Sequence, residues 1–333
     1  MVLVFLYTEG VKAIKKSGLG KAIEHQKRAC ELNNINFTKN KNDNWDILHI
    51  NTYFLKSYFI AKKARKQGKK VVYHAHSTEE DYKDGFILAK QTSKLFKWWL
   101  VKCYKLGNVL ITPTDYSKKL ISSYKGLENT KIYDVSNGIE LDFFQRNEKM
   151  GQEFRNKYNI KENEKVIIGI GLYIERKGIV DFVELAKRMK NYKFIWFGSS
   201  PLLFSTRKVK KAVRTKLDNL IFAGYVDRNE IKSALSGCDL FIFPTLEETE
   251  GMPIVEACAC KTKSIVRDIP VFDPWLKDGV NVYKAKDVDE FEDKIKMILD
   301  GKLEDLTEAA YKVAEERDLK SIGEKLKNIY ESL

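Results

Sequence analysis

Two glutamates that stand eight positions apart have the residue types and the setting that best suit chemistry on a ligand. Glu248 lies in a polar loop after the apolar run 239–243, and Glu256 lies in a stretch expected to become helical near Pro253, since proline is best tolerated in the first helical turn. Helix-end amides between the two carboxylates carry partial positive charge, which suits a phosphate. The pattern predicts a sugar-nucleotide site, with phosphates on the amides and hydroxyls on the carboxylates.

The spacing of these glutamates is not specific by itself. The chain repeats it at Glu308/Glu316 and at Glu316/Glu324. Those repeats lie in a C-terminal stretch with the pattern of an exposed helix, so they are expected to be solvated charges. The setting of strand, polar loop, Gly251, proline and helix distinguishes the first pair.

Length and composition bound the class of protein. The chain has 333 residues, which exceeds one typical core and favours two domains. It has no run of about 18 apolar residues, so no transmembrane helix is expected. The apolar start is expected to be a strand, because the features of a signal peptide are missing. The five cysteines are scattered and odd in number, which favours a reducing cytosol over a disulfide framework.

The net charge of +13 is concentrated in the first half of the chain. Residues 1–147 hold 26 Lys and Arg against 14 Asp and Glu, a balance of +12, whereas residues 148–333 hold 33 against 32. The basic half is therefore expected to approach something anionic, such as a membrane surface or a nucleic acid. It has no recognisable nucleic-acid recognition module, which disfavours the second partner.

Apolar runs alternate with amphipathic helical stretches in two consecutive series. Strands are expected at 2–7, 46–50, 70–75, 109–112 and 132–135, and again at 165–171, 193–197, 219–223, 239–243 and 263–266. Such runs predict parallel sheets that helices cover on both faces. The fold class is therefore α/β, with two Rossmann-like doubly wound domains at 1–147 and 148–309. Their ligands are expected at the carboxyl ends of the strands, in the cleft between the facing domains.

In each domain, a glycine-containing segment follows the first strand. In the second domain, Gly171 precedes Arg176 and Lys177, whose charges would suit a diphosphate; an exposed basic turn is the alternative. In the first domain, residues 15–22 contain Gly18 and Gly20. They do not form a P-loop, because Ala22 stands where a P-loop has the hydroxyl that binds magnesium. That segment is expected either to approach a phosphate or sugar through its amides or to be a plain loop.

His74 and His76 stand at the carboxyl end of a predicted strand. Alternation places both on one face of the sheet. Metal binding would need more ligands, and the chain has only four histidines. We expect hydrogen bonding to a sugar or an acceptor.

The stretch 86–106 has a helical pattern in which aromatic residues stand among lysines. Its residues predicted to contact a membrane are Lys94, Lys97, Trp98, Trp99, Lys102 and Lys105. Aromatics bordered by lysines are what an interfacial helix presents to anionic lipid. The alternative is a core-packed helix with a solvated lysine face. The basic cluster at 207–214 is expected to be a solvated helix face.

With these motifs in order, the chain resembles the retaining glycosyltransferases of family 4, which have the GT-B fold. Glu248-x-x-Gly251 with Glu256-Ala257 is similar to the family's paired-glutamate signature. Gly171 with Lys177-Gly178 resembles its diphosphate loop. Further similarity lies in Gly198-Ser199-Ser200-Pro201, in Asn137-Gly138-Ile139 and, more weakly, in 46–49 and His76.

The resemblance implies a role for each matched residue. Glu248 would hold hydroxyls of the donor sugar, Glu256 the ribose, and Arg176 and Lys177 the diphosphate, while His76 would lie near the transferred sugar. The implied donor-binding set also includes Gly18, Gly20, Gly171, Gly198, Ser199, Gly251 and Met252. A C-terminal helix at about 310–333 would join the first domain. The chain departs from the family at Leu172, where arginine is frequent, and at Glu250, where an aromatic is frequent.

Within the family, the short chain and its Trp/Lys helix resemble bacterial synthases that extend monoglucosyldiacylglycerol. The resemblance implies transfer of glucose or galactose from a UDP-sugar at the cytoplasmic face of the cell membrane, as a peripheral enzyme. No cofactor or metal is expected, because no Asp-x-Asp motif is found where a metal–diphosphate bridge would need one. A polyprenyl-linked or capsular saccharide is the alternative acceptor. A basic nucleic-acid-binding protein is the alternative of another class.

Overall fold

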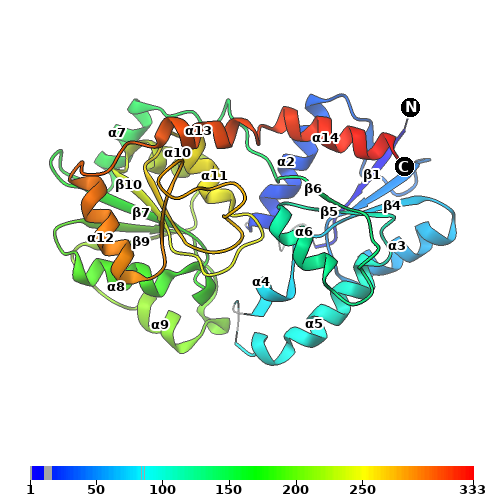
Figure 1. Cartoon of the computed structure of the whole chain (residues 1–333), viewed down its shortest axis with the longest axis horizontal. Coiled ribbons are helices and arrows are strands. Elements are labelled where there is room, and N and C mark those ends of the chain that lie inside the picture. The colour runs from blue at the N-terminus through cyan, green and yellow to red at the C-terminus, as the bar shows by residue number, and fades with distance from the viewer. Residues whose placement is uncertain (1, 11–16, 84, 86) are drawn as a thin grey trace. The chain divides into compact units, whose positions relative to one another are not determined.

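The protein consists of two α/β units (Figure 1). A computed structural model describes residues 2–10, 17–83, 85 and 87–333. Among them, unit 1 spans residues up to Tyr82, Gln91–Glu140 and Arg317–Leu333, and unit 2 spans Lys83–Lys90 and Leu141–Glu316. Each unit has its own six-stranded sheet.

The sheet of unit 1 is parallel throughout. In spatial order its strands are β2 (Phe37–Thr38), β1 (Val4–Tyr7), β3 (Ile47–Ile50), β4 (Lys70–His74), β5 (Val109–Thr112) and β6 (Ile132–Asp134). The helices lying wholly or mainly in this unit are α2 (Gly18–Leu32), α3 (Leu55–Lys66), α4 (Glu79–Lys83), α5 (Ala89–Tyr104), α6 (Asp115–Ser122) and α14 (Leu319–Glu331). All residues of β3 and β5 are buried, because helices cover both faces of a parallel sheet.

The sheet of unit 2 is also parallel. Its strands, in spatial order, are β12 (Tyr283–Ala285), β11 (Ser264–Arg267), β10 (Leu240–Phe243), β7 (Val166–Ile170), β8 (Lys193–Phe197) and β9 (Leu220–Gly224). Its helices are α7 (Glu148–Lys157), α8 (Ile179–Arg188), α9 (Arg207–Val213), α10 (Arg228–Gly237), α11 (Met252–Ala259), α12 (Val288–Leu299) and α13 (Thr307–Glu315), with 3₁₀ turns η1 (Glu175–Lys177) and η2 (Leu202–Phe204). Because β7 and β10 are neighbours, the loops after these strands leave the sheet side by side.

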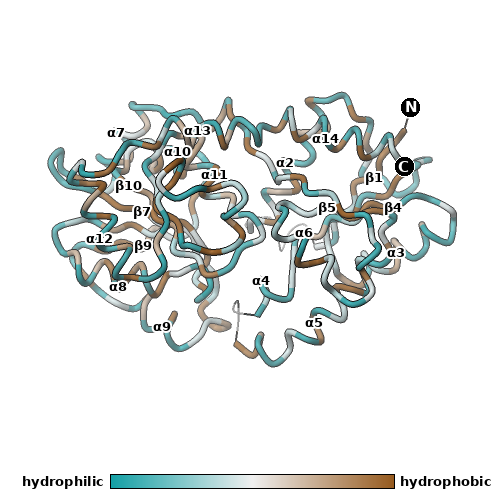
Figure 2. Tube along the Cα trace, viewed as in Figure 1, coloured by the Kyte–Doolittle hydropathy of each residue, from teal (hydrophilic) through white to brown (hydrophobic). Residues whose placement is uncertain are grey.

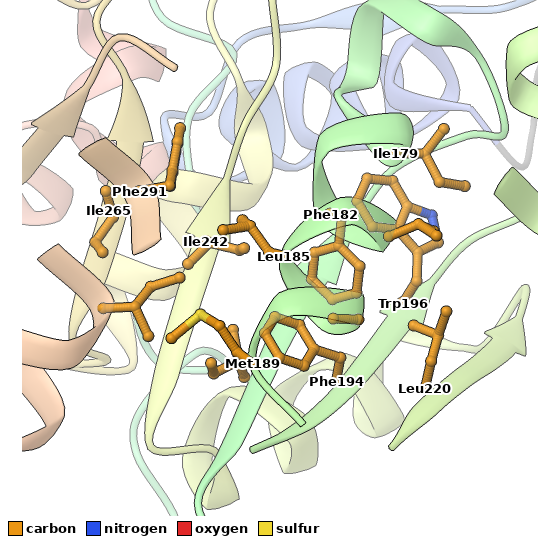
Figure 3. Packing of buried hydrophobic residues seen from close by; sticks show 14 of the residues in the cluster. Ile179, Phe182, Leu185, Met189, Phe194, Trp196, Leu220, Ile242, Ile265 and Phe291 are labelled. Atoms are coloured by element: carbon orange, nitrogen blue, oxygen red, sulfur yellow. The ribbon is translucent and has the colours of Figure 1, made fainter. Parts of the chain in front are cut away.

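Aromatic packing fills the core of unit 2 on the face covered by α8. The Phe182 ring of α8 meets Phe194 and Trp196 of β8 edge-on, with ring centroids 5.3 and 5.0 Å apart (Figure 3). All three side chains are fully buried. Hydropathy follows the same plan, with hydrophobic residues along strands such as β4 and β7 and hydrophilic residues along outer turns (Figure 2). The core therefore fixes the strand ends from which the site loops emerge.

The predicted fold class, α/β with two Rossmann-like parallel sheets, is confirmed. Every predicted strand is present within two residues of its expected bounds. The sequence analysis missed β2 and β12, which are edge strands of two and three residues, too short to show an alternating pattern. Among the described helices, none is both long enough and apolar enough to cross a bilayer.

The unit boundaries lie at 140/141 and 316/317, whereas the sequence analysis placed them at 147/148 and near 310. Side-chain contacts explain the first difference, since the Phe143 ring stacks 3.7 Å from the Arg228 guanidinium and the Phe144 carbonyl accepts from the Cys260 thiol at 3.3 Å. The second arises because α13 packs on α11. Lys261, just after α11, pairs at 2.7 Å with Glu308, an exposed carboxylate as expected.

Helix α14 joins unit 1 by packing on α2. Its apolar side chains Leu319, Ile322, Leu326 and Ile329 share a core cluster with Ala29 and Cys30 of α2. A β-carbon added at Gly323 would overlap the Asn33 side chain and the Ala29 carbonyl oxygen. The glycine therefore allows the close approach of the two helices.

We expect Gly323→Ala to lower the free energy of unfolding by about 1–3 kcal/mol, because the methyl group forces the helices apart. Gly18→Ala in the first turn of α2 is the matched control, since its added β-carbon meets none of the described residues within 4 Å. Thermal unfolding of both variants checks the expectation. Equal melting temperatures for the two variants would show that the contact is not tight.

Candidate active site

Two glycine turns at the carboxyl ends of β7 and β8 touch through their backbones. The Gly171 amide donates to the Phe197 carbonyl at 2.9 Å, and the Trp196 indole donates to the Gly171 carbonyl at 2.9 Å. Gly198 has a φ of 106°, and a β-carbon there would overlap the Gly171 carbonyl oxygen. Ser199 follows in the half-buried part of this turn. Glycine is required at 198 for both its conformation and the close contact.

Arg176 and Lys177 surround the Glu248 carboxylate. The Lys177 ammonium forms an ion pair with Oε1 of Glu248, and the Arg176 guanidinium lies 3.8 Å from Oε2. The Thr245 hydroxyl donates to Oε1 at 2.9 Å. Only 7% of the Glu248 side chain is exposed, so these contacts replace water around the carboxylate. The three charged groups carry a net charge of +1, which suits an anionic ligand.

The loops that carry these groups are joined by backbone hydrogen bonds. The Leu246 amide donates to the Arg176 carbonyl at 2.7 Å, and Arg176 Nη1 donates to the Glu247 carbonyl at 3.0 Å. Gly178 ends η1 with a φ of 75°, and a β-carbon there would overlap the Pro244 carbonyl. The segment after β7 and the segment after β10 therefore hold each other in place.

Glu248 is an ionised carboxylate at neutral pH. Burial raises its pKa, but the charges of Lys177 and Arg176, together with the hydrogen bonds from Lys177 and Thr245, outweigh burial and hold the pKa below its usual value of 4.5. A carboxylate in this state can accept hydrogen bonds but has no proton to give. It is therefore not suited to act as a general acid.

Helix α11 begins at Met252, one residue before Pro253, as the sequence predicted. Gly251 precedes the helix with a φ of 92°, and a β-carbon there would lie 2.9 Å from the Phe243 ring. Glu256 lies further along α11 and is only 1% exposed. Both members of the glutamate pair are thus buried within unit 2.

The remaining predicted site residues belong to unit 1. Gly18 and Gly20 form the first turn of α2, where the Ser17 hydroxyl caps the Gly20 amide at 3.3 Å. Of the two alternatives for this segment, the plain loop is therefore wrong at 18–20, and Lys15 and Lys16 of the same motif lie outside the described residues. His76 stacks on His74 with ring centroids 3.8 Å apart, which confirms that the two rings share one face.

Comparison with known proteins assigns the family. The model of group 1 glycosyl transferases matches residues 151–315, and that of glycosyltransferase family 4 matches residues 35–143. A processive diacylglycerol alpha-glucosyltransferase from Acholeplasma laidlawii is 38% identical over 99% of this chain and 98% of its own. The chain belongs to this glycosyltransferase family.

Two further similar proteins have lower sequence identity to the glycosyltransferase. An alpha-galactosylglucosyldiacylglycerol synthase from Streptococcus pneumoniae is 22% identical over 68% of this chain and 61% of its own. The crystal structure of Anabaena HepE in complex with UDP-glucose superposes with a TM-score of 0.79 over 100% of both chains, at 17% identity. The solved structure supports the fold assignment.

The Trp/Lys helix of the glycosyltransferase corresponds to α5, and its two tryptophans differ. Trp98 is 52% exposed, with the Lys102 ammonium 4.0 Å above its ring. Trp99 is half-buried and donates from its indole to the Tyr53 carbonyl at 2.6 Å. Lys97 pairs with Glu79 at 3.1 Å, whereas Lys94, Lys102 and Lys105 are exposed. Phe86, where the predicted helix begins, lies outside the described residues.

The sequence analysis missed the exposed apolar side chains of α3. Leu55 and Phe59 are 63% and 62% exposed, and Lys56 and Lys62 beside them are exposed as well. The Tyr58 ring of α3 lies 5.3 Å from the Trp99 ring, so α3 and α5 are neighbours. The available signal in the sequence was the pair Leu55 and Phe59, which stand four residues apart among lysines.

A buried arginine beside the site was also missed. Arg267 ends β11, forms an ion pair with Asp181 of α8 and donates to the Pro244 carbonyl at 3.2 Å. It thereby supports the loop after β10. A charged residue at the end of an apolar run was the only signal.

Within the described part of the chain, no group of three or more His, Cys, Asp or Glu side chains could hold a metal ion. The absence of a metal requirement stays a prediction.

We expect Glu248→Gln to lower the free energy of unfolding at pH 7 by ~3 kcal/mol, because it leaves Lys177 and Arg176 without a counter-charge. Since the folded pKa of Glu248 lies below its usual value of 4.5, this difference from wild type should persist above that pH and shrink as the pH falls through the folded pKa. Thermal unfolding at a series of pH values measures it. Glu324→Gln, at an exposed position of α14, is the control. A loss of unfolding free energy that does not change with pH would contradict the role of the Glu248 charge.

Proposed function

We propose that this glycosyltransferase moves a hexose, glucose or galactose, from a UDP-sugar to monoglucosyldiacylglycerol, with retention of the anomeric configuration. The product is a diglycosyldiacylglycerol. The observation that carries the proposal is the buried Glu248 carboxylate held by Lys177 and Arg176, beside the start of α11. The relative named as a diacylglycerol alpha-glucosyltransferase supports the lipid acceptor.

The charged residues around Glu248 would contact different parts of the donor. Lys177, Arg176 and the first amides of α11 would stabilise the negative charge of the leaving diphosphate without a metal ion. Glu248 would accept hydrogen bonds from hydroxyls of the transferred hexose, and Glu256 would hold the ribose. Because Lys177 and Thr245 already engage Oε1 of Glu248, this carboxylate is suited to positioning the sugar rather than to attacking it.

Retention without a protein nucleophile suggests a same-face reaction. The acceptor hydroxyl attacks the anomeric carbon from the side that the diphosphate leaves, and the departing phosphate oxygen takes the hydroxyl proton. Catalysis then comes from positioning both substrates and from stabilising the diphosphate.

We expect Glu248→Ala to lower kcat for hexose transfer by roughly 100-fold or more, as the loss of an electrostatic contact in an active site does. Glu324→Ala, which removes an exposed carboxylate of α14, should leave kcat unchanged. Transfer from UDP-hexose to glucosyldiacylglycerol is measured in anionic lipid with and without EDTA, and circular dichroism verifies folding. Near wild-type turnover of Glu248→Ala would refute its role, and loss of wild-type activity in EDTA would refute the metal-free mechanism.

The acceptor is decided by offering competing substrates to the wild-type protein. Each UDP-hexose is incubated with diacylglycerol, glucosyldiacylglycerol and a polyprenyl-diphosphate sugar, and the products are identified. The proposal predicts a diglycosyl lipid. Because the Acholeplasma relative is named processive, we also propose that diacylglycerol itself is glycosylated. A product formed only on the polyprenyl substrate would favour the capsular alternative.

We further propose that unit 1 binds the cytoplasmic face of the cell membrane through a lipid-binding face formed by α3 and α5. This face comprises Leu55, Phe59, Leu95 and Trp98, which are exposed apolar residues, together with the exposed Lys94 and Lys102. Aromatic and aliphatic side chains among lysines suit the headgroup region of an anionic bilayer.

Charge reversal tests this face. Lys94→Glu/Lys102→Glu should weaken binding to anionic vesicles at least tenfold, since each basic residue near such a surface contributes about 1 kcal/mol. Arg207→Glu/Lys211→Glu on α9 changes the net charge equally at exposed positions of unit 2 and serves as the control. Co-sedimentation is compared across lipid compositions and salt concentrations. Equal losses in both variants would mean that net charge alone drives binding.

A further inference from the structure

Three of the four histidines lie together in unit 1, in a ring of contacts made of four side-chain hydrogen bonds and closed by the stacked His74 and His76 rings. His49 belongs to β3, and His74 ends β4 with His76 two residues later. Gln26 of α2 and Asn51 complete the ring. Except for the half-buried His76, all of these side chains are buried. The hexose-transfer mechanism assigns no task to His49, His74, Gln26 or Asn51.

The amides of Asn51 and Gln26 determine the proton on His76. Asn51 Nδ2 donates to Gln26 Oε1 at 2.8 Å, so the other Asn51 atom, Oδ1, is the one that faces His76. Oδ1 lies 3.2 Å from Nε2 of His76. A carbonyl oxygen can only accept. Nε2 of His76 therefore carries the hydrogen, and the Nδ1 atom of the neutral ring keeps its lone pair.

The same reasoning fixes His49 and His74. Because Gln26 Oε1 accepts from Asn51, Gln26 Nε2 donates to Nε2 of His49 at 2.8 Å. The hydrogen of His49 is then on Nδ1, which donates to the Tyr330 hydroxyl of α14 at 2.7 Å. His74 Nδ1 lies 3.3 Å from the same Nε2 atom of His49 and donates to it, sharing its lone pair with Gln26. Both rings are thus Nδ1–H tautomers, opposite to His76.

The neutral state on which this assignment depends follows from burial. Burial lowers the pKa of His49 and of His76 to about 3, and it lowers the pKa of His74 well below its usual range. At neutral pH none of the three rings is an imidazolium, which would donate from both nitrogens. The ring of contacts can therefore hold each histidine in one tautomer.

We propose that Asn51, Gln26 and His49 are positioning residues that hold His76 as the neutral Nε2–H tautomer and leave its Nδ1 lone pair to accept a hydrogen bond from a substrate hydroxyl. The inference rests on the proposed function and on the expectation, implied by the family resemblance, that His76 lies near the transferred sugar. Nδ1 of His76 forms no hydrogen bond with the described residues. A lone pair attracts an O–H donor and repels a phosphate oxygen, so the ligand class is a sugar or lipid hydroxyl.

The tautomers can be read directly by NMR. In full-length protein labelled with ¹⁵N-histidine, long-range ¹H–¹⁵N correlations at pH 7 distinguish the two ring nitrogens of all four histidines. We expect His76 as Nε2–H and His49 and His74 as Nδ1–H. His25, which bonds through Nδ1 to the Gly138 carbonyl at 2.8 Å, should also be Nδ1–H. A wild-type spectrum with His76 as Nδ1–H, or as an imidazolium, would overturn the inference without any variant.

Asn51→Leu tests the positioning role. It removes the acceptor for His76 while roughly keeping the side-chain volume, so the single His76 tautomer should become a mixture and the His25 signals should not move. We expect kcat to fall roughly tenfold, because the His76 lone pair is then no longer held toward the substrate hydroxyl. An unaltered His76 spectrum or wild-type kcat would overturn the positioning role. A wild-type protein that transfers no hexose would instead overturn the proposed function. The NMR spectra would still report the histidine tautomers, so the two failures can be distinguished.

Discussion

The buried carboxylate of Glu248 sets the main constraint on unit 2. A charged group out of contact with water must be compensated by opposite charge and hydrogen bonds, and here Lys177, Arg176 and Thr245 supply both. These residues come from two segments that the sheet order makes neighbours, since β7 pairs with β10. Gly178 and Gly198 allow close approach to the carbonyls of Pro244 and Gly171, and Gly171 leaves room for the Trp196 and Lys177 side chains.

A second, partly buried ion pair supports the first. Arg267 at the end of β11 pairs with Asp181 of α8 and also donates to the Pro244 carbonyl, directly before the loop that carries Glu248. The Pro244 carbonyl in turn lies against Gly178. The site loop after β10 is thus held by α8, β11 and η1 together, which keeps the Glu248 carboxylate in place.

The sequence predicted the elements that repeat and missed those that depend on tertiary contacts. Apolar runs located the main strands, and proline with glycine located the start of α11, because these signals are local. The sequence could not separate Trp98 from Trp99, because tertiary contacts of Trp99 with Tyr53 and Tyr58 decide which ring is covered. It placed His74 and His76 on one face but gave no reason to join them to Gln26, whose partners in the ring lie 23 or more positions away.

The division of labour between Glu248 and the diphosphate-binding groups is the central claim, and calorimetric titration of UDP and of UDP-glucose tests it most directly. UDP lacks the hexose that Glu248 is proposed to hold. The account predicts that Glu248→Gln weakens binding of UDP-glucose while leaving the affinity for UDP close to that of wild type. Equal weakening of both ligands, or of neither, would contradict a role for Glu248 on the transferred sugar.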